Sequence, residues 1–285
     1  MKFKKLLAVT LSAAMMFTVP AYANEPEAIA VYQELEAKSQ NMSDMNAIYD
    51  YHVDVSGGGL SMDTNMQMSM QANNLLNPDL MKMNMDAVMT MGKVVDKSGG
   101  PGAVQELDLT GVPITYNYYY ENGMYYIDMM GSKVKYPMPL AEAMKAIRSN
   151  TELMDTGLEY MHNLTLRTEG ENRILSYTLD TAQMNELVQK VLTMSGMAQM
   201  TQTEGVELTY REISGEYTIR PDGYYTNAKM SMVADMQVQG QEMTMDIDLN
   251  VELINPGQPV EVKTPNLAEY QDAQSLNVQT DTAAQ

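Results

Sequence analysis

The strongest constraint in this sequence is a run of apolar residues at every second position between residues 60 and 72. Four of these residues are methionines, and polar side chains occupy the positions between them; only Thr64 interrupts the apolar series. Because the side chains of a β-strand point alternately to opposite faces, the pattern places thioethers on one face and amides, hydroxyls and a carboxylate on the other. The segment is therefore predicted to be a half-buried antiparallel strand.

The same alternation returns in three further segments, residues 81–91, 228–238 and 243–253. Each segment is about twice the usual strand length of about 5–6 residues, so together they predict a tall sheet that curls around an apolar space. We predict an α+β protein: a strongly curved antiparallel β-sheet, or half-open barrel, with helices packed on its concave face. The side chains expected to line the concavity and bind a ligand are Met66, Met68, Met70, Met83, Met85, Met230, Met232, Met236, Met243 and Met245.

The first 23 residues have the pattern of a secretory signal peptide. Lysines precede an apolar run that ends at Val19, and the small residues Ala21 and Ala23 predict cleavage after Ala23. The apolar run is shorter than the roughly 20 residues of a membrane-spanning helix, and the chain has no cysteine for a lipid anchor. We therefore expect a protein secreted into the extracellular or cell-envelope space, with no stable membrane anchor.

The charge balance disfavours nucleic acid as a partner. Removal of residues 1–23 takes away three lysines and no acids, which changes the formal charge from −19 to −22. Binding to phosphate backbones requires a basic face, and this composition provides none. We expect one domain over residues 24–265, followed by a tail, residues 266–285, with a disordered composition.

The remaining segments predict helices and shorter strands around the long ones. Residues 25–42 and 181–192 have helical spacing, the second with Thr181 as its N-cap, and a helix is expected to start at Pro139. Strands are predicted at residues 49–55, 114–120, 124–130, 133–136, 206–213, 215–220 and 260–263, with a hairpin over residues 160–179 and a loose linker at 195–205. Five tyrosines between residues 118 and 126 fit the rim of a sheet, with the ring inside and the hydroxyl in water.

The C-terminal part of this pattern resembles the LolA and LppX type of lipoprotein carrier, and most closely a group of uncharacterised exported bacterial proteins with that predicted fold. The matching features are residues 215–219, the turn at Asp222 and Gly223, the methionine strands around Gly240, and the closing segment from Asn255 to Pro265. The resemblance covers about the last 70 residues well and the rest by pattern. It implies a half-open β-barrel whose concave face is closed by helices. Members of that group are often lipid-anchored through a cysteine, which this chain lacks.

The first functional hypothesis is a non-enzymatic binding protein for a hydrophobic ligand, a lipid or acylated molecule. Ligand pockets of this kind are concave and mostly apolar, and methionine, present here 30 times, adapts to varied shapes. The alternative for each methionine is plain core packing, and for the protein a structural cell-surface module without a ligand. No cofactor is expected.

Two other chemistries fit the sequence less well. Thioethers bind copper(I), but copper sites usually recruit histidine or cysteine, and His52 and His162 fall at positions expected at the surface. Paired carboxylates such as Asp246 with Asp248 fit a wet strand face better than an acid–base pair or a calcium site, and no metal site is predicted. The motifs of common nucleophilic, zinc and phosphate-binding enzymes are absent, so we expect no enzymatic activity.

Overall fold

The computed structural model describes residues 24–272, apart from residues 78, 97–104, 138–157, 187–205 and 239–240. Within these ranges the chain forms a helix of 15 residues, the start of a second helix at residues 181–186, a short 3₁₀ helix and a single 14-stranded sheet. The bounds of the elements are α2 Pro26–Gln40, β1 Met45–Gly57, β2 Leu60–Asn73, β3 Lys82–Met91, β4 Lys93–Asp96, β5 Gln105–Asp108, β6 Ile114–Glu121, β7 Met124–Met129, β8 Ser132–Pro137, β9 Met161–Glu169, β10 Asn172–Leu179, β11 Val206–Ile219, β12 Tyr225–Val238, β13 Gln241–Leu253, η1 Leu267–Glu269 and β14 Gln271–Asp272.

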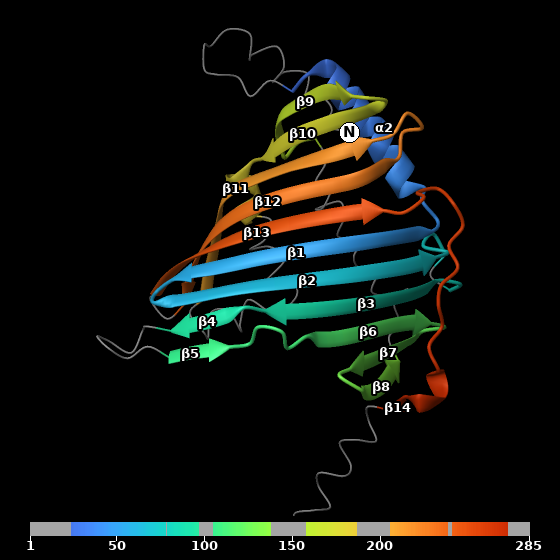
Figure 1. Cartoon of the computed structure of the whole chain (residues 1–285). Helices are drawn as coiled ribbons and strands as arrows, with labels where there is room; N and C mark the ends of the chain where they lie inside the picture. The colour runs from blue at the N-terminus through green and yellow to red at the C-terminus, as the bar shows by residue number, and fades with distance from the viewer. Residues whose placement is uncertain are drawn as a thin grey trace, which may run out of the picture.

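The sheet is curved and does not close on itself (Figure 1). Its order is β14-β8-β7-β6-β3-β2-β1-β13-β12-β11-β10-β9. Off this path, β4 pairs with the first two residues of β2, and β5 pairs with β4. Every pair on this path is antiparallel except β14 with β8. The prediction of a half-open antiparallel barrel with a helix packed on it is therefore confirmed, and the four methionine segments form β2, β3, β12 and β13.

The centre of the sheet joins strands that lie far apart in the chain. β1 pairs with β2 on one side, across the short turn that contains Gly58 and Gly59, and with β13 on the other, with Ala47 opposite Leu253. Alternation within a strand cannot specify such a partner, because the partner is nearly 200 residues away in sequence. This pairing makes one continuous surface of the two groups of methionine strands.

Helix α2 packs on the sheet at the end formed by β9, β10 and β11 (Figure 1). It begins with a proline in its first turn, an arrangement that costs no helical hydrogen bond, and carries Glu27 early and Lys38 late, as the helix dipole favours. Its buried residues, Ala28, Val31 and Leu35, follow the helical spacing that predicted it.

The chain that leads into α2 covers the free edge of β9. The Leu164 backbone N–H donates to Asn24 Oδ1 at 2.9 Å, and the Glu25 N–H donates to the Leu164 carbonyl at 2.9 Å. The Asn24 amide donates to the Met161 carbonyl at 3.0 Å, and the Leu166 N–H donates to Glu25 Oε2 at 3.0 Å. Four edge groups that would otherwise face solvent are thereby satisfied.

After β13, a C-terminal strap, residues 254–270, crosses the ends of the central strands (Figure 1). The Val260 N–H donates to Asp44 Oδ2 at 2.9 Å, the Asn73 amide donates to the Val260 carbonyl at 3.2 Å, and the Tyr119 hydroxyl meets Thr264 Oγ1 at 3.1 Å. The strap ends in β14, which pairs with β8.

Several predictions about the shorter elements need correction. The predicted strand at residues 260–263 is irregular backbone, held by side-chain hydrogen bonds in place of a ladder. The predicted strands 206–213 and 215–220 are one strand, β11, with a bulge near Tyr210. Beyond residue 265, where a disordered tail was expected, η1 and β14 are ordered because Gln271 and Asp272 find a partner strand.

The N-cap of the helix that starts at residue 181 is also corrected. The Gln183 N–H donates to the carboxylate of Asp180 at 2.9 Å, so Asp180 caps the helix, one residue before the predicted Thr181. The signal peptide, the helix from Pro139, the later part of the 181–192 helix and the 195–205 linker lie outside the described residues.

Candidate functional site

All ten predicted methionines lie on one face of the sheet, which we call the apolar face. Residues directly opposite one another in antiparallel strands share a face, so the register fixes this arrangement. On β2 and β3, Met66 pairs with Met89, Met70 with Met85, and Ala72 with Met83. On β12 and β13, Met236 pairs with Met243, Met232 with Ile247, and Ala234 with Met245.

Strand β1 separates these two groups of methionines and joins them with its own apolar residues. Tyr51 lies between Met66 on β2 and Leu249 on β13, and Leu249 in turn faces Met230 on β12. Tyr49 occupies the equivalent place beside Met68. The predicted lining is therefore one surface across five neighbouring strands, β3, β2, β1, β13 and β12.

The methionines of this face are half-buried. Met243 is buried, whereas the other nine predicted residues keep part of their surface exposed. The polar residues between them, such as Asn65, Gln67 and Ser69, are exposed on the opposite face. The division into an apolar and a polar face is thus the one that the alternation predicts.

Tyrosines extend the apolar face beyond β3, and the prediction of the lining did not include them. Tyr118 lies opposite Met85, and Tyr116 lies opposite Ala87. The rings of Tyr116 and Tyr118 stack with their centroids 6.2 Å apart, Tyr118 stacks on Tyr125 at 5.8 Å, and Tyr125 meets Tyr136 edge-on at 5.5 Å. Burial raises the pKa of Tyr125 to about 12. The alternation of Ile114, Tyr116 and Tyr118 was the sequence signal that would have included them.

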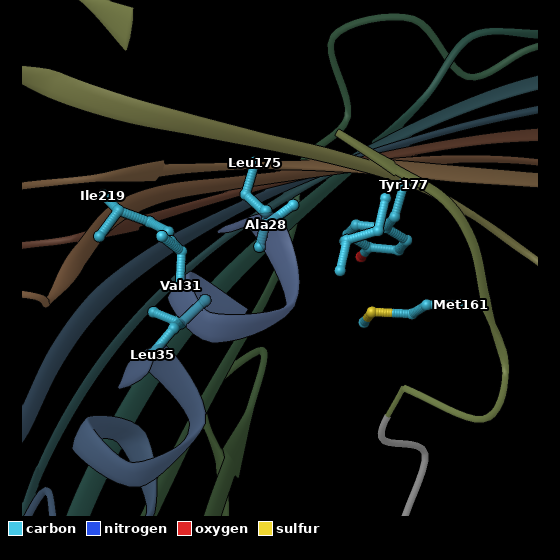
Figure 2. Close-up of a cluster of buried hydrophobic side chains, with 8 residues drawn as sticks. Ala28, Val31, Leu35, Met161, Leu175, Tyr177 and Ile219 are labelled. Atoms are coloured by element: carbon cyan, nitrogen blue, oxygen red, sulfur yellow. The ribbon is translucent and has the colours of Figure 1, made fainter. Parts of the chain in front are cut away.

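At the other end of the sheet α2 covers the apolar face (Figure 2). Its residues Ala28, Val31 and Leu35 pack against Leu175 on β10 and Ile219 on β11. By register, Leu175 belongs to the same cross-strand row as Tyr217 and Ala228, and so to the apolar face. Helix packing and the methionine rows therefore share one side of the sheet.

The opposite face, the polar face, is acidic. A groove of about 690 Å³ runs over it, lined by side chains that include Asp50, His52, Gln67, Lys229 and Asp248. Gln67 donates to Asp50 at 2.8 Å, and Ser231 donates to Asp248. Of the pair Asp246 and Asp248, the second is thus bonded to a neutral partner on a wet strand face.

His52 lies among acids on the polar face and is 40% exposed. Its Nδ1 lies 2.9 Å from Asn65 Oδ1, and its Nε2 lies 3.0 Å from Asp54 Oδ2, while Asp63 Oδ2 is 3.6 Å from Nδ1. The Asn65 hydrogen bond and then the Asp54 and Asp63 carboxylates raise the pKa of His52. An imidazolium can donate from both nitrogens at once, so this arrangement favours the charged ring.

The ligand atoms of His52, Asp54 and Asp63 lie within 4.8 Å of one another, so these three described side chains are close enough to share a metal ion. His162 lies elsewhere, 3.3 Å from the carboxylate of Asp180. His52 lies opposite Asn65 on the polar face, and His162 lies opposite Thr178 on β10, so neither shares a cross-strand row with the methionines of the apolar face. None of the helices in the described part of the chain is long and apolar enough to span a membrane.

One curved, unclosed sheet with an apolar face and a helix packed on that face defines the chain as a half-open β-barrel protein. It belongs to a family of unknown function, DUF6612, whose model matches residues 27–271. No curated protein matches the chain.

Several solved structures are similar to this chain, and three of them are described here. LprF from Mycobacterium bovis shares 14% identity over 85% of this chain and 99% of its own, with a TM-score of 0.40. The lipoprotein LppX from Mycobacterium tuberculosis shares 9% identity over 84% of this chain and 100% of its own, with a TM-score of 0.39. A DUF1329 family protein from Desulfovibrio piger shares 10% identity over 81% of this chain and 94% of its own, with a TM-score of 0.26. The predicted resemblance to the LppX type is confirmed. At this low identity the resemblance carries no information about what this chain binds.

Proposed function

We propose that this protein is an exported, non-enzymatic binding protein that holds a hydrophobic ligand, a lipid or an acylated molecule, against the methionine rows of its apolar face. The observation that carries the proposal is the register, which aligns apolar side chains across β3, β2, β1, β13 and β12 without a polar residue directly opposite Met66, Met68 or Met70.

The chemistry of these side chains fits an aliphatic ligand. Removing one methylene group from water contributes about 0.8 kcal/mol, so an acyl chain gains affinity in proportion to the length that it lays on the face. Methionine has flexible torsions and a polarizable sulfur, so it accommodates chains of different shape. The groove on the polar face is lined by charged side chains as well as by Met66 and Met230, and the charged groups suit such a ligand less well.

Export follows from the signal-peptide pattern of residues 1–23 and forms part of the proposal. An exported carrier meets lipids and lipid fragments outside the cytoplasm, where an apolar ligand needs protection from water. The net charge of the chain gives no basic face for anionic headgroups, so the apolar part of the ligand supplies the binding energy.

The proposal is tested by native mass spectrometry of the protein purified from its own culture without detergent. We expect an adduct of lipid mass that is lost on organic extraction. Copper mass in the adduct would replace this proposal with a copper(I) site, and a bare protein that also fails to bind added fluorescent fatty acid would refute it.

A pair of double variants locates the ligand. Met68→Gln with Met232→Gln keeps side-chain size but adds amides to the apolar face, and should lower fatty-acid affinity at least tenfold. Ser69→Gln with Ser231→Gln changes the adjacent residues of the same strands on the polar face and should leave affinity unchanged. Equal effects of the two pairs would place the ligand elsewhere.

A further inference from the structure

The turn between β7 and β8 carries a residue that its backbone disfavours. Met130 and Gly131 form its two-residue loop with φ of +51° and +88°. The turn between β6 and β7 has the same geometry, with φ of +52° and +73°, and consists of Asn122 and Gly123. Asparagine and glycine are the usual residues of such type I′ turns, whereas methionine is strained at positive φ.

The hydrogen bonds of this turn do not require methionine. The Met130 N–H donates to the Thr115 carbonyl at 3.2 Å, and the Gly131 N–H donates to Asp128 Oδ1 at 2.9 Å. These contacts use backbone donors that asparagine would equally provide. The Met130 side chain is 67% exposed, so packing within the described fold does not explain it either.

Met130 follows another exposed methionine, and we call the two residues, Met129 and Met130, the tip patch. Met129 is 48% exposed. Met129 lies opposite Tyr116, which lies opposite Ala87, which lies opposite Met68. The tip patch is therefore the exposed end of a cross-strand row that runs into the centre of the apolar face.

We infer that the tip patch contacts a zwitterionic lipid surface and that, if the proposed function holds, hydrophobic ligand passes between this surface and the apolar face along the Met129–Tyr116–Met68 row. Exposed flexible apolar side chains at a hairpin tip insert readily at the boundary of headgroups and acyl chains. The formal charge of −19 disfavours an anionic surface, and continuity with the apolar face favours lipid over a protein partner.

The test is flotation of the full protein with phosphatidylcholine vesicles. The variant is Met129→Gln with Met130→Asn, which makes the second turn like the first. The matched control is Leu76→Gln with Leu80→Gln, because these two residues are 50% and 60% exposed in the β2–β3 connection, at the opposite end of the strands. Thermal unfolding should show the Met130→Asn turn to be at least as stable as the original, so lost binding cannot reflect unfolding.

We expect the original protein and the control to float together with the vesicles, and the Met129/Met130 variant to bind about tenfold more weakly, given the apolar area that it removes. Adding anionic lipid should weaken binding of the original protein. Absence of flotation, equal flotation of the variant, or an oligomer that the variant dissociates would overturn the inference. Because flotation needs no bound ligand, it is independent of the fatty-acid assay, which alone decides the proposed function.

Discussion

Gly215 should be irreplaceable as long as Tyr177 is present. The two residues lie opposite each other on β11 and β10. A Cβ atom at position 215 would come within 2.8 Å of Tyr177 Cε1 and closer still to its Cζ and hydroxyl oxygen. These distances are shorter than van der Waals contact allows, so even a methyl group forces the ring to move.

The ring has little freedom to move. Tyr177 is 7% exposed and belongs to the buried cluster that α2 covers (Figure 2). Its ring stacks on that of Tyr217, with the centroids 5.6 Å apart. Overpacking a well-packed core costs about 1–3 kcal/mol. We therefore expect Gly215→Ala to lower the free energy of unfolding by about 2 kcal/mol.

Urea unfolding of a double-mutant cycle tests this reasoning. Tyr177→Leu removes the three atoms that the new methyl group would meet, so Gly215→Ala should cost less than about 0.5 kcal/mol in that background. The coupling between the two sites should thus be about 1.5 kcal/mol or more. If the effects of the two substitutions on the free energy of unfolding are instead additive, the clash with Tyr177 does not cause the loss of stability. Backbone effects at position 215 would then be its cause.

Two further predictions concern His52 and the methionine rows. The folded-state pKa of His52 is raised, so its contribution to stability is complete below the unfolded pKa of about 6.5 and is lost as the pH rises through the folded pKa. The urea midpoint of the original protein should therefore decline across this pH range, and His52→Gln should abolish the decline. An unchanged decline in the variant would assign it to other groups. Hydrogen peroxide should convert exposed thioethers of the apolar face to polar sulfoxides and so lower the affinity for fatty acid. Treatment with both methionine sulfoxide reductases should restore the affinity. Oxidation without loss of affinity would argue against the methionine rows as the binding surface.

The sequence predicts the faces of this sheet well because alternation is a local property. Each of Met66, Met68 and Met70 is assigned to its face by its own neighbours, and the register agrees. The hairpin predicted over residues 160–179 is likewise local, and β9 and β10 pair within it. The order of residues 267–272 was not predicted because β14 pairs with β8, and the composition of the segment itself cannot reveal that partner.

The candidate site shows the same division between local and distant information. The ten methionines were identified from alternation, whereas their union into one surface depends on β1 pairing with β13. The tyrosines of β6 and β7 were assigned to a rim because their polar hydroxyls obscured the apolar alternation that they continue. The turn at Met130 and Gly131 could be recognised only from the positive φ of Met130, because the dipeptide Met-Gly is no turn signal.

The contacts of Asn24 and Glu25 with β9 bear on self-association. An open sheet has two edges, and an uncovered edge can accept a strand from another molecule and so begin a fibril. Here the first two residues after the predicted cleavage point occupy the β9 edge, with Asn24 bonded to Met161 and Leu164, and Glu25 to Leu164 and Leu166. A processing event that trimmed the chain by two residues would therefore remove one hydrogen bond of α2, from the Ile29 N–H to the Glu25 carbonyl, and would turn this edge into a template for polymerisation.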